Sequence, residues 1–155
     1  MNNDHRSRIL IGQSAAVLLA AGAIHAAAFP AAAPIIDQAT LPSSLRQAYK
    51  ALWLVDSTNL TTLALLYAFV AFRPSAMSRE AVLLSALAPL AGAILLYSYM
   101  GNFFAGHLML VSWALATVGA MLRDRARGAM PMIERARDSH RWSWRSRRSS
   151  SVLTQ

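Results

Sequence analysis

The sequence contains no cysteine and only one lysine, Lys50. The absence of cysteine excludes disulfide bonds, thiolate nucleophiles and metal sites built on thiolate ligands. The chain also lacks a glycine-rich phosphate loop and any nucleophile motif of a hydrolase, so nothing in it indicates ATP hydrolysis or proteolysis. The preference for arginine over lysine, together with abundant alanine, is consistent with a bacterial protein encoded by GC-rich DNA.

Charge is scarce outside the C-terminal part of the chain. Of the 155 residues, 14% are charged and 55% are hydrophobic, and nine of the fifteen basic residues are arginines between Arg123 and Arg148. A membrane-spanning helix needs about 20 mostly apolar residues, and four segments meet this requirement. They cover residues 9–29, 51–72, 81–100 and 103–122. The sequence therefore predicts an all-α integral membrane four-helix up-and-down bundle over residues 1–122, followed by a basic cytoplasmic tail over residues 123–155.

The arginines also predict the orientation of the bundle. Arg6 and Arg8 precede the first span, Arg73 and Arg79 lie between the second and third, and the basic tail follows the fourth. Basic residues near the ends of spans remain on the cytoplasmic side. We therefore expect both termini in the cytoplasm of a multi-pass protein of the bacterial inner membrane.

Two features of the N-terminal half allow further interpretations. Residues 30–49 contain three prolines and several turn residues, and they are predicted to form an external loop. The first apolar run, preceded by two arginines and followed by Ala26 to Ala28, also resembles a signal peptide with its cleavage site. Cleavage there would leave three spans with the same orientation and would remove His25.

Three ionisable side chains lie inside the predicted spans near the outer surface. Asp56, the only carboxylate in any span, lies about five residues into the second span. His25 lies about four residues before the first span ends, and His107 lies about four residues after the fourth begins. All three are thus expected about one helical turn below the surface. Because buried ionisable groups in membranes pair and often carry function, the sequence predicts a single catalytic site of Asp56, His25 and His107.

Four further side chains are predicted to bind a ligand at this site. Asn59 and Trp53 share the helical face of Asp56, while Tyr97 and Asn102 lie close to it in depth. A carboxylate beside an imidazole is a general acid–base pair. The predicted function is therefore the binding of a lipophilic small molecule, or its conversion by proton transfer as in an isomerase. A structural Asp–His cluster that fixes helix order, or simple wetting of Asp56, are the non-functional interpretations.

Other classes of function remain open. The small size of the chain, a face of small residues in the first span and the basic tail are typical of a non-catalytic accessory or assembly subunit, with a membrane protein or a second copy as partner. His25 and His107 on two helices suggest a bis-histidine haem electron carrier. Two histidines and Asp56 suggest zinc, although no His-x-x-x-His pair supports it. The cofactor is therefore unknown from the sequence, and the absence of any cofactor is favoured over haem or zinc.

The basic tail has the pattern of a surface-binding helix. Beyond Pro131, a single helical stripe contains Ile133, Ala136, His140 and Trp144, with arginines around it. Such a segment suits the anionic cytoplasmic leaflet. Arginines interleaved with aromatic residues also occur in nucleic-acid binders. Because the lipid surface is the closer anion, the predicted partner is membrane lipid rather than nucleic acid.

The predicted orientation can be tested with reporter fusions. A reporter enzyme that is active only outside the cytoplasm should be active when fused after Gln47 and inactive when fused after Arg127, because the arginines keep their segments inside. Reporter activity on the same side for both fusions would contradict four spans.

Overall fold

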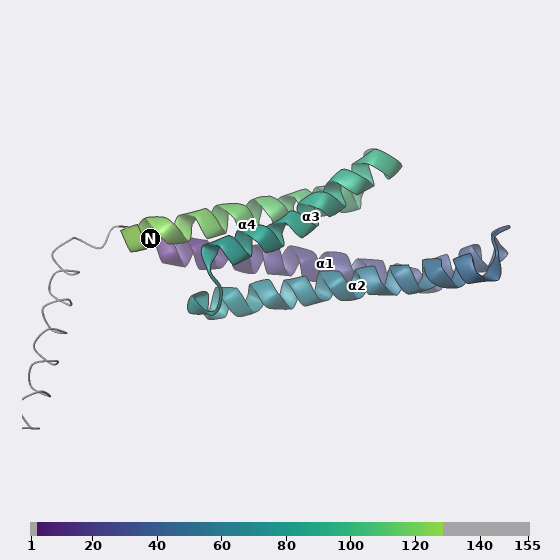
Figure 1. The fold of residues 1–155 in the computed structure, drawn as a ribbon, viewed down its shortest axis with the longest axis horizontal. Helices are drawn as coiled ribbons and strands as arrows, with labels where there is room; N and C mark the ends of the chain where they lie inside the picture. The colour runs from purple at the N-terminus through teal and green to yellow at the C-terminus, as the bar shows by residue number, and fades with distance from the viewer. Residues whose placement is uncertain (1–2, 129–155) are drawn as a thin grey trace, which may run out of the picture.

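The computed structural model describes residues 3–128, with side chains described as far as Arg123. In this part the chain forms four long helices and one short 3-10 helix (Figure 1). They are α1 (Asn3–Gln38), α2 (Ser43–Phe72), η1 (Pro74–Ala76), α3 (Arg79–Met100) and α4 (Phe104–Gly128). All four long helices are long and apolar enough to cross a membrane. The prediction of an all-helical chain with four helices able to cross a membrane is confirmed, whereas the predicted lipid-binding stripe lies outside the described residues.

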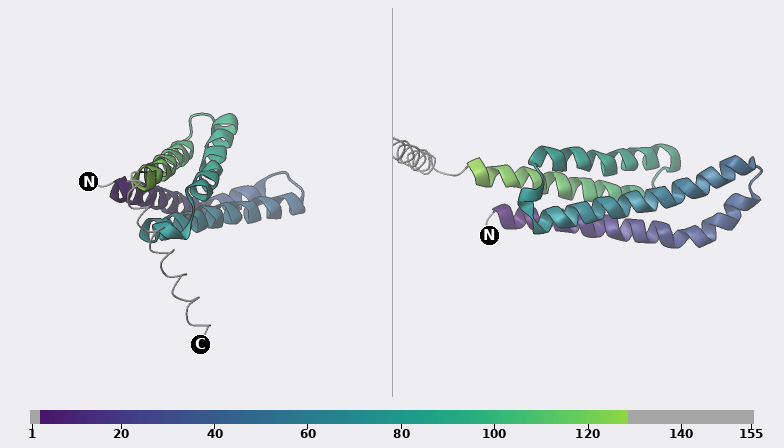
Figure 2. Two further views of the ribbon diagram at one scale, coloured as in Figure 1. Left: turned by 60° about the vertical axis from the view of Figure 1, so that its left-hand side comes forward. Right: turned by 60° about the horizontal axis from the view of Figure 1, so that its bottom comes forward.

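The helices form two hairpins that meet along α1 and α4. α1 contacts both α2 and α4, and α4 contacts both α1 and α3. α2 and α3 are linked close to η1, where the hydroxyl groups of Ser85 and Tyr67 lie 3.3 Å apart, and they diverge from there (Figure 2). α1 is therefore a central helix, with Ile11 and Leu18 fully buried.

The predicted loop over residues 30–49 is wrong, because most of it is helical. α1 continues through Pro30 and Pro34 to Gln38, and α2 already begins at Ser43. A proline inside a helix removes one hydrogen bond and bends the helix, but the alanines around both prolines have the highest helix propensity. α1 accordingly bends toward its C-terminal end without breaking (Figure 2).

Asp37 ties the end of this long hairpin together. Lys50 Nζ donates to Asp37 Oδ2 at 2.7 Å, and Arg46 donates to the Asp37 carbonyl at 2.6 Å. These contacts satisfy a carbonyl in the last turn of α1 that has no intrahelical partner.

Small residues allow α1 and α4 to approach closely. Ser7 Oγ donates to the Gly119 carbonyl at 2.6 Å, and Ser14 Oγ lies 2.9 Å from both the carbonyl and the hydroxyl of Ser112. A Cβ atom on Gly119 would lie 2.8 Å from Ile11 Cγ1. Small residues at the interface between two helices are typical of close helix packing in membranes.

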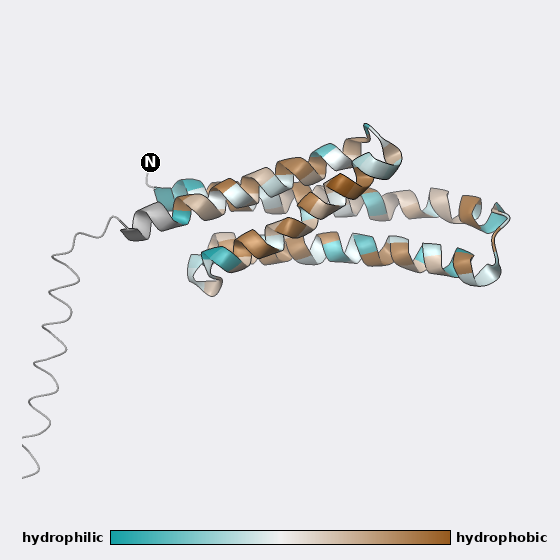
Figure 3. Ribbon diagram, turned by 45° about the horizontal axis from the view of Figure 1, so that its top comes forward, coloured by the Kyte–Doolittle hydropathy of each residue, from teal (hydrophilic) through white to brown (hydrophobic). Residues whose placement is uncertain are grey.

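The same contacts set the antiparallel register of α1 and α4. Extended along both helices, they place the turn between α3 and α4, at residues 101–103, level with about residues 23–25 of α1. The α1–α2 hairpin therefore extends about 20 Å beyond that turn, since helices rise 1.5 Å per residue. Figure 3 shows this extension of α1 and α2 past the ends of α3 and α4.

The close contact at Gly119 predicts sensitivity to a single methyl group. Gly119→Ala should lower the free energy of unfolding by about 1–3 kcal/mol, because the added Cβ overlaps Ile11 and the Ser7 carbonyl. Gly92→Ala is the matched control, since its Cβ would meet only Met109 at 3.9 Å. Thermal unfolding of both variants in the same detergent measures the difference, and equal stability would contradict the close packing.

Candidate functional site between α1 and α2

His25 of α1 is held by three side chains from one face of α2. The rings of His25 and Trp53 are stacked with centroids 4.5 Å apart, and Trp53 Nε1 donates to the His25 carbonyl at 2.8 Å. Nδ1 of His25 lies 2.9 Å from Ser57 Oγ, and Nε2 lies 3.7 Å from Asp56 Oδ2. Trp53, Asp56 and Ser57 share this face because residues three and four apart are neighbours on a helix. The structure thus brings together His25, Asp56 and Trp53, as the sequence predicts.

A glycine about one turn before His25 allows α1 and α2 to approach closely at this point. A Cβ on Gly22 would lie 3.0 Å from Thr61 Oγ1 and 3.4 Å from the Ser57 carbonyl. Without a side chain at this position, α2 lies close enough for Ser57 to reach the imidazole. Ser57 was not among the predicted site residues. Its signal in the sequence is the spacing of four from Trp53, which places a hydroxyl beside the indole.

The Ser57 hydroxyl gives His25 a partner in either protonation state. Its Oγ also lies 3.1 Å from the Trp53 carbonyl, which is a pure acceptor. When Nδ1 carries a proton, it donates to Ser57, and Ser57 donates to the carbonyl. When Nδ1 has no proton, the hydroxyl rotates and donates to Nδ1. Nδ1 therefore keeps a hydrogen-bond partner whether or not it carries a proton. In the neutral ring with the proton on Nδ1, Nε2 is the accepting nitrogen, and it lies 3.7 Å from Asp56 Oδ2, a contact longer than a direct hydrogen bond.

The carboxylate is the accessible member of the pair. The Asp56 side chain is 58% exposed and the His25 side chain 30% exposed. A molecule at the surface of the hairpin can therefore contact Asp56 directly, whereas His25 is partly covered by Trp53. A carboxylate beside an imidazole has the chemistry for general acid–base work, and here the carboxylate is the exposed member.

His107 lies in a different place, on the α3–α4 hairpin. Its ring meets Tyr97 edge-on at 5.6 Å, and its Nδ1 lies 3.2 Å from the Phe103 carbonyl. The register of α1 and α4 places His107 about six residues, or about 9 Å, from the level of His25. It is also five residues from Ser112, which turns it about 140° away from the face of α4 that contacts α1. The structure does not bring His107 to the other two residues.

The reason lies in the unequal lengths of the two hairpins. A depth counted from the ends of the predicted spans assumes that all four spans end at one surface. Because α1 and α2 continue beyond the α3–α4 turn, a residue one turn from the end of the α1–α2 hairpin does not lie at the same height as a residue one turn from the end of the α3–α4 hairpin. His25 and Asp56 share a level because they belong to the same hairpin.

The other predicted ligand-binding residues are spread over the two hairpins. Trp53 belongs to the His25 cluster, and Asn59 is exposed on α2 one turn from Asp56. Tyr97 pairs with His107, and Asn102 is exposed in the α3–α4 turn. Tyr97 therefore belongs to a separate aromatic–imidazole pair with His107, and neither Tyr97 nor Asn102 is part of the His25 cluster.

Neither metal arrangement fits these positions. Within the described residues, no group of three or more His, Asp or Glu side chains is placed to hold a metal ion. His25 and His107 do not face each other across a common space, as the two axial ligands of a haem would.

Comparison with known proteins leaves the function to be argued from this geometry: no protein-family model, curated protein or solved structure matches the chain.

The role of Ser57 in the cluster can be measured through stability. Ser57→Ala leaves Nδ1 of His25 without a protein partner and should lower the free energy of unfolding by about 1–2 kcal/mol. Thr58→Ala is the matched control, because the exposed Thr58 hydroxyl donates to Leu54 of its own helix and its loss should cost less than about 0.5 kcal/mol. Chemical denaturation in detergent compares the two, and equal losses would argue against the Ser57–His25 bond.

Proposed function

We propose that this chain is a four-span, up-and-down membrane protein with both termini in the cytoplasm. Its function is to bind a lipophilic small molecule near the outer surface and to exchange a proton with it. The observation that carries the proposal is the His25–Asp56 pair, with Ser57 able to support either protonation state of the imidazole.

The lengths of the helices suggest where this pair lies in the membrane. α3 has 22 residues and is therefore about 33 Å long, which matches the hydrocarbon core of about 30 Å. The α3–α4 turn then lies at the outer boundary of the core, and His25 and Asp56 lie at the same level. Trp53 suits this boundary, where amphipathic aromatic residues concentrate.

This position suits the greater exposure of Asp56 in the pair. At the boundary, Asp56 is accessible to water and head groups, so its charge does not carry the full cost of burial in hydrocarbon. A ligand with an apolar body can remain in the acyl-chain region while a carbonyl or hydroxyl group reaches the carboxylate. His25 then supplies the proton-accepting nitrogen behind Asp56.

The proposal can be tested on the purified protein without knowing the ligand in advance. Organic extracts of the wild type should contain an enriched lipophilic molecule by mass spectrometry. Asp56→Asn should lose most of it, because the variant keeps the shape of the side chain and removes its charge and basicity. Size-exclusion chromatography should show unchanged assembly.

His107→Gln is the matched control, because it removes an imidazole that lies outside the pair. It should retain the molecule at the wild-type level. Equal loss in both variants, or no enrichment in the wild type, would contradict a site at His25 and Asp56.

A second candidate function is that of an accessory or assembly subunit. It is favoured by apolar side chains on the part of the α1–α2 hairpin that extends beyond the α3–α4 turn. Ile35 is 71% exposed there, and Leu45, Tyr49 and Leu52 are also exposed. If the α3–α4 turn marks the outer boundary of the hydrocarbon, lipid tails do not cover Ile35 or Leu45, so a partner protein would. On this function, Asp56→Asn and the wild type would yield the same extract and the same co-purifying subunit.

A further inference from the structure

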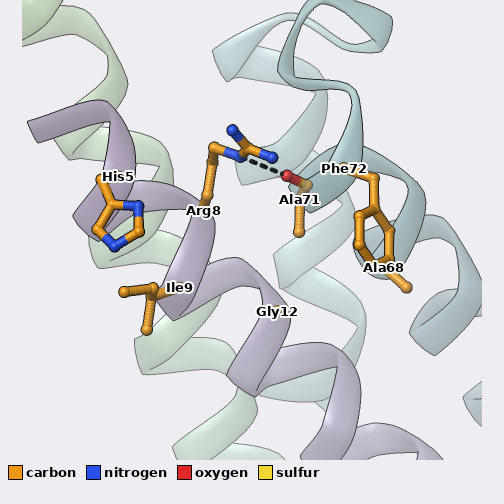
Figure 4. A pocket seen from close by; sticks show the side chains of 7 residues that line it. All are labelled: His5, Arg8, Ile9, Gly12, Ala68, Ala71 and Phe72. Carbon is orange, nitrogen blue, oxygen red and sulfur yellow. Dashed lines mark hydrogen bonds between the residues drawn. The ribbon is translucent and has the colours of Figure 1, made fainter.

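A groove of about 440 Å³ lies at the opposite end of the α1–α2 pair, where α2 ends. Figure 4 shows Arg8 reaching from α1 to Ala71 of α2, with Gly12 further along α1 and the Phe72 ring on the α2 side. The groove combines two cationic or protonatable side chains with apolar walls. Its lining residues are His5, Arg8, Ile9, Gly12, Ala68, Ala71 and Phe72.

A hydrogen bond to the end of α2 positions the Arg8 side chain. Arg8 Nε donates to the Ala71 carbonyl at 2.9 Å, which is one of the last carbonyls of α2 and has no intrahelical partner. This bond uses one of the five N–H groups of the guanidinium. The four N–H groups on the terminal nitrogens remain able to donate to an acceptor in the groove. Their planar arrangement matches two oxygens of a phosphate group.

The wall beside Arg8 has room for an apolar chain. A Cβ added to Gly12 would meet only Ala71 Cβ, at 3.8 Å. Ala68 and Phe72 continue the apolar surface on the α2 side, and the Phe72 side chain is largely exposed. A soluble phosphate would use Arg8 and His5 alone. A molecule with an anionic head group and a long apolar tail would use the whole groove.

The charge at this end of the molecule also favours an anion. Five arginines with described side chains gather here, against two carboxylates. The arginines are Arg6, Arg8, Arg73, Arg79 and Arg123, and the carboxylates are Asp4 and Glu80.

From these observations we propose that the groove binds one anionic phospholipid of the leaflet on the arginine-rich side of the protein. The phosphate lies on Arg8 and His5, and one acyl chain runs along Gly12 and Ala68. This site is independent of the His25–Asp56 pair, because Arg8 lies about 25 Å from the level of His25 along α1.

The test uses the full-length protein in detergent, titrated with phosphatidylglycerol or phosphatidylcholine and measured by native mass spectrometry. One phosphatidylglycerol should bind more tightly than any phosphatidylcholine. Arg8→Gln should weaken that binding about tenfold, the expected loss of one charge-assisted contact. Arg6→Gln is the matched control, because it removes the same charge two residues away, outside the groove lining, and it should have little effect.

A second pair of variants tests the acyl chain at constant charge. Gly12→Leu should abolish the tight binding by filling the groove, whereas Gly12→Ala should preserve it, because its Cβ meets only Ala71. If Gly12→Leu does not fold, Ala68→Leu fills the groove from the α2 side. Excess glycerol 3-phosphate should not displace the lipid.

Several outcomes would overturn the site. Equal losses in Arg8→Gln and Arg6→Gln would indicate diffuse attraction to the arginine-rich end. Unchanged binding in Gly12→Leu would exclude an acyl chain in the groove. Full displacement by glycerol 3-phosphate would assign the groove to a soluble phosphate instead.

Discussion

The close approach of α1 and α4 is the contact on which the rest of the structure depends. Ser7, Ser14, Ser112 and Gly119 keep the two backbones near each other, with hydrogen bonds of 2.6–2.9 Å across the interface. Hydrogen bonds between membrane helices contribute on average only about 0.6 kcal/mol each. Their main effect is therefore on register, because a shift of either helix would move Ile11 out of the space that Gly119 leaves for it and against a residue that carries a side chain. That register decides how far the α1–α2 hairpin extends beyond the α3–α4 turn.

The His25 cluster follows from a second close approach, that of α1 and α2 at Gly22. There, the α2 backbone lies near enough for Trp53, Asp56 and Ser57 to reach one imidazole. Trp53 orients the ring, and Ser57 provides a donor or an acceptor as required. Asp56 faces the remaining nitrogen. An Asp–His contact by itself is weak evidence of function in a membrane protein, because such pairs also serve as structural links. The Ser57 hydroxyl is the feature that supports the proposed proton exchange, because it can donate to the imidazole or accept from it.

α1 contributes to both proposed sites, one at its N-terminal end and the other about 25 Å further along the helix. At the N-terminal end, Arg8 satisfies a carbonyl of α2 and presents its remaining donors to a groove with a glycine in its wall. Toward the other end, His25 meets the start of the apolar part of α2. The two sites use the same principle: a small residue, Gly12 or Gly22, removes bulk next to a polar side chain.

The sequence by itself determined the class of the protein. A chain with four long apolar segments satisfies its backbone hydrogen bonds in a membrane by forming helices. Helical periodicity then places Asp56 and Trp53 on one face of the second helix. Only the tertiary structure decided which of the candidate residues meet. Local propensity could not show that α1 continues through Pro30 and Pro34, because a proline inside a helix costs about 3 kcal/mol and usually ends it. The contacts of Asp37 with Arg46 and Lys50, which hold the segment beyond the prolines against α2, exist only in the tertiary structure. The longer hairpin that results separates His107 from His25 by about two turns of helix, since depth depends on how helices slide against each other.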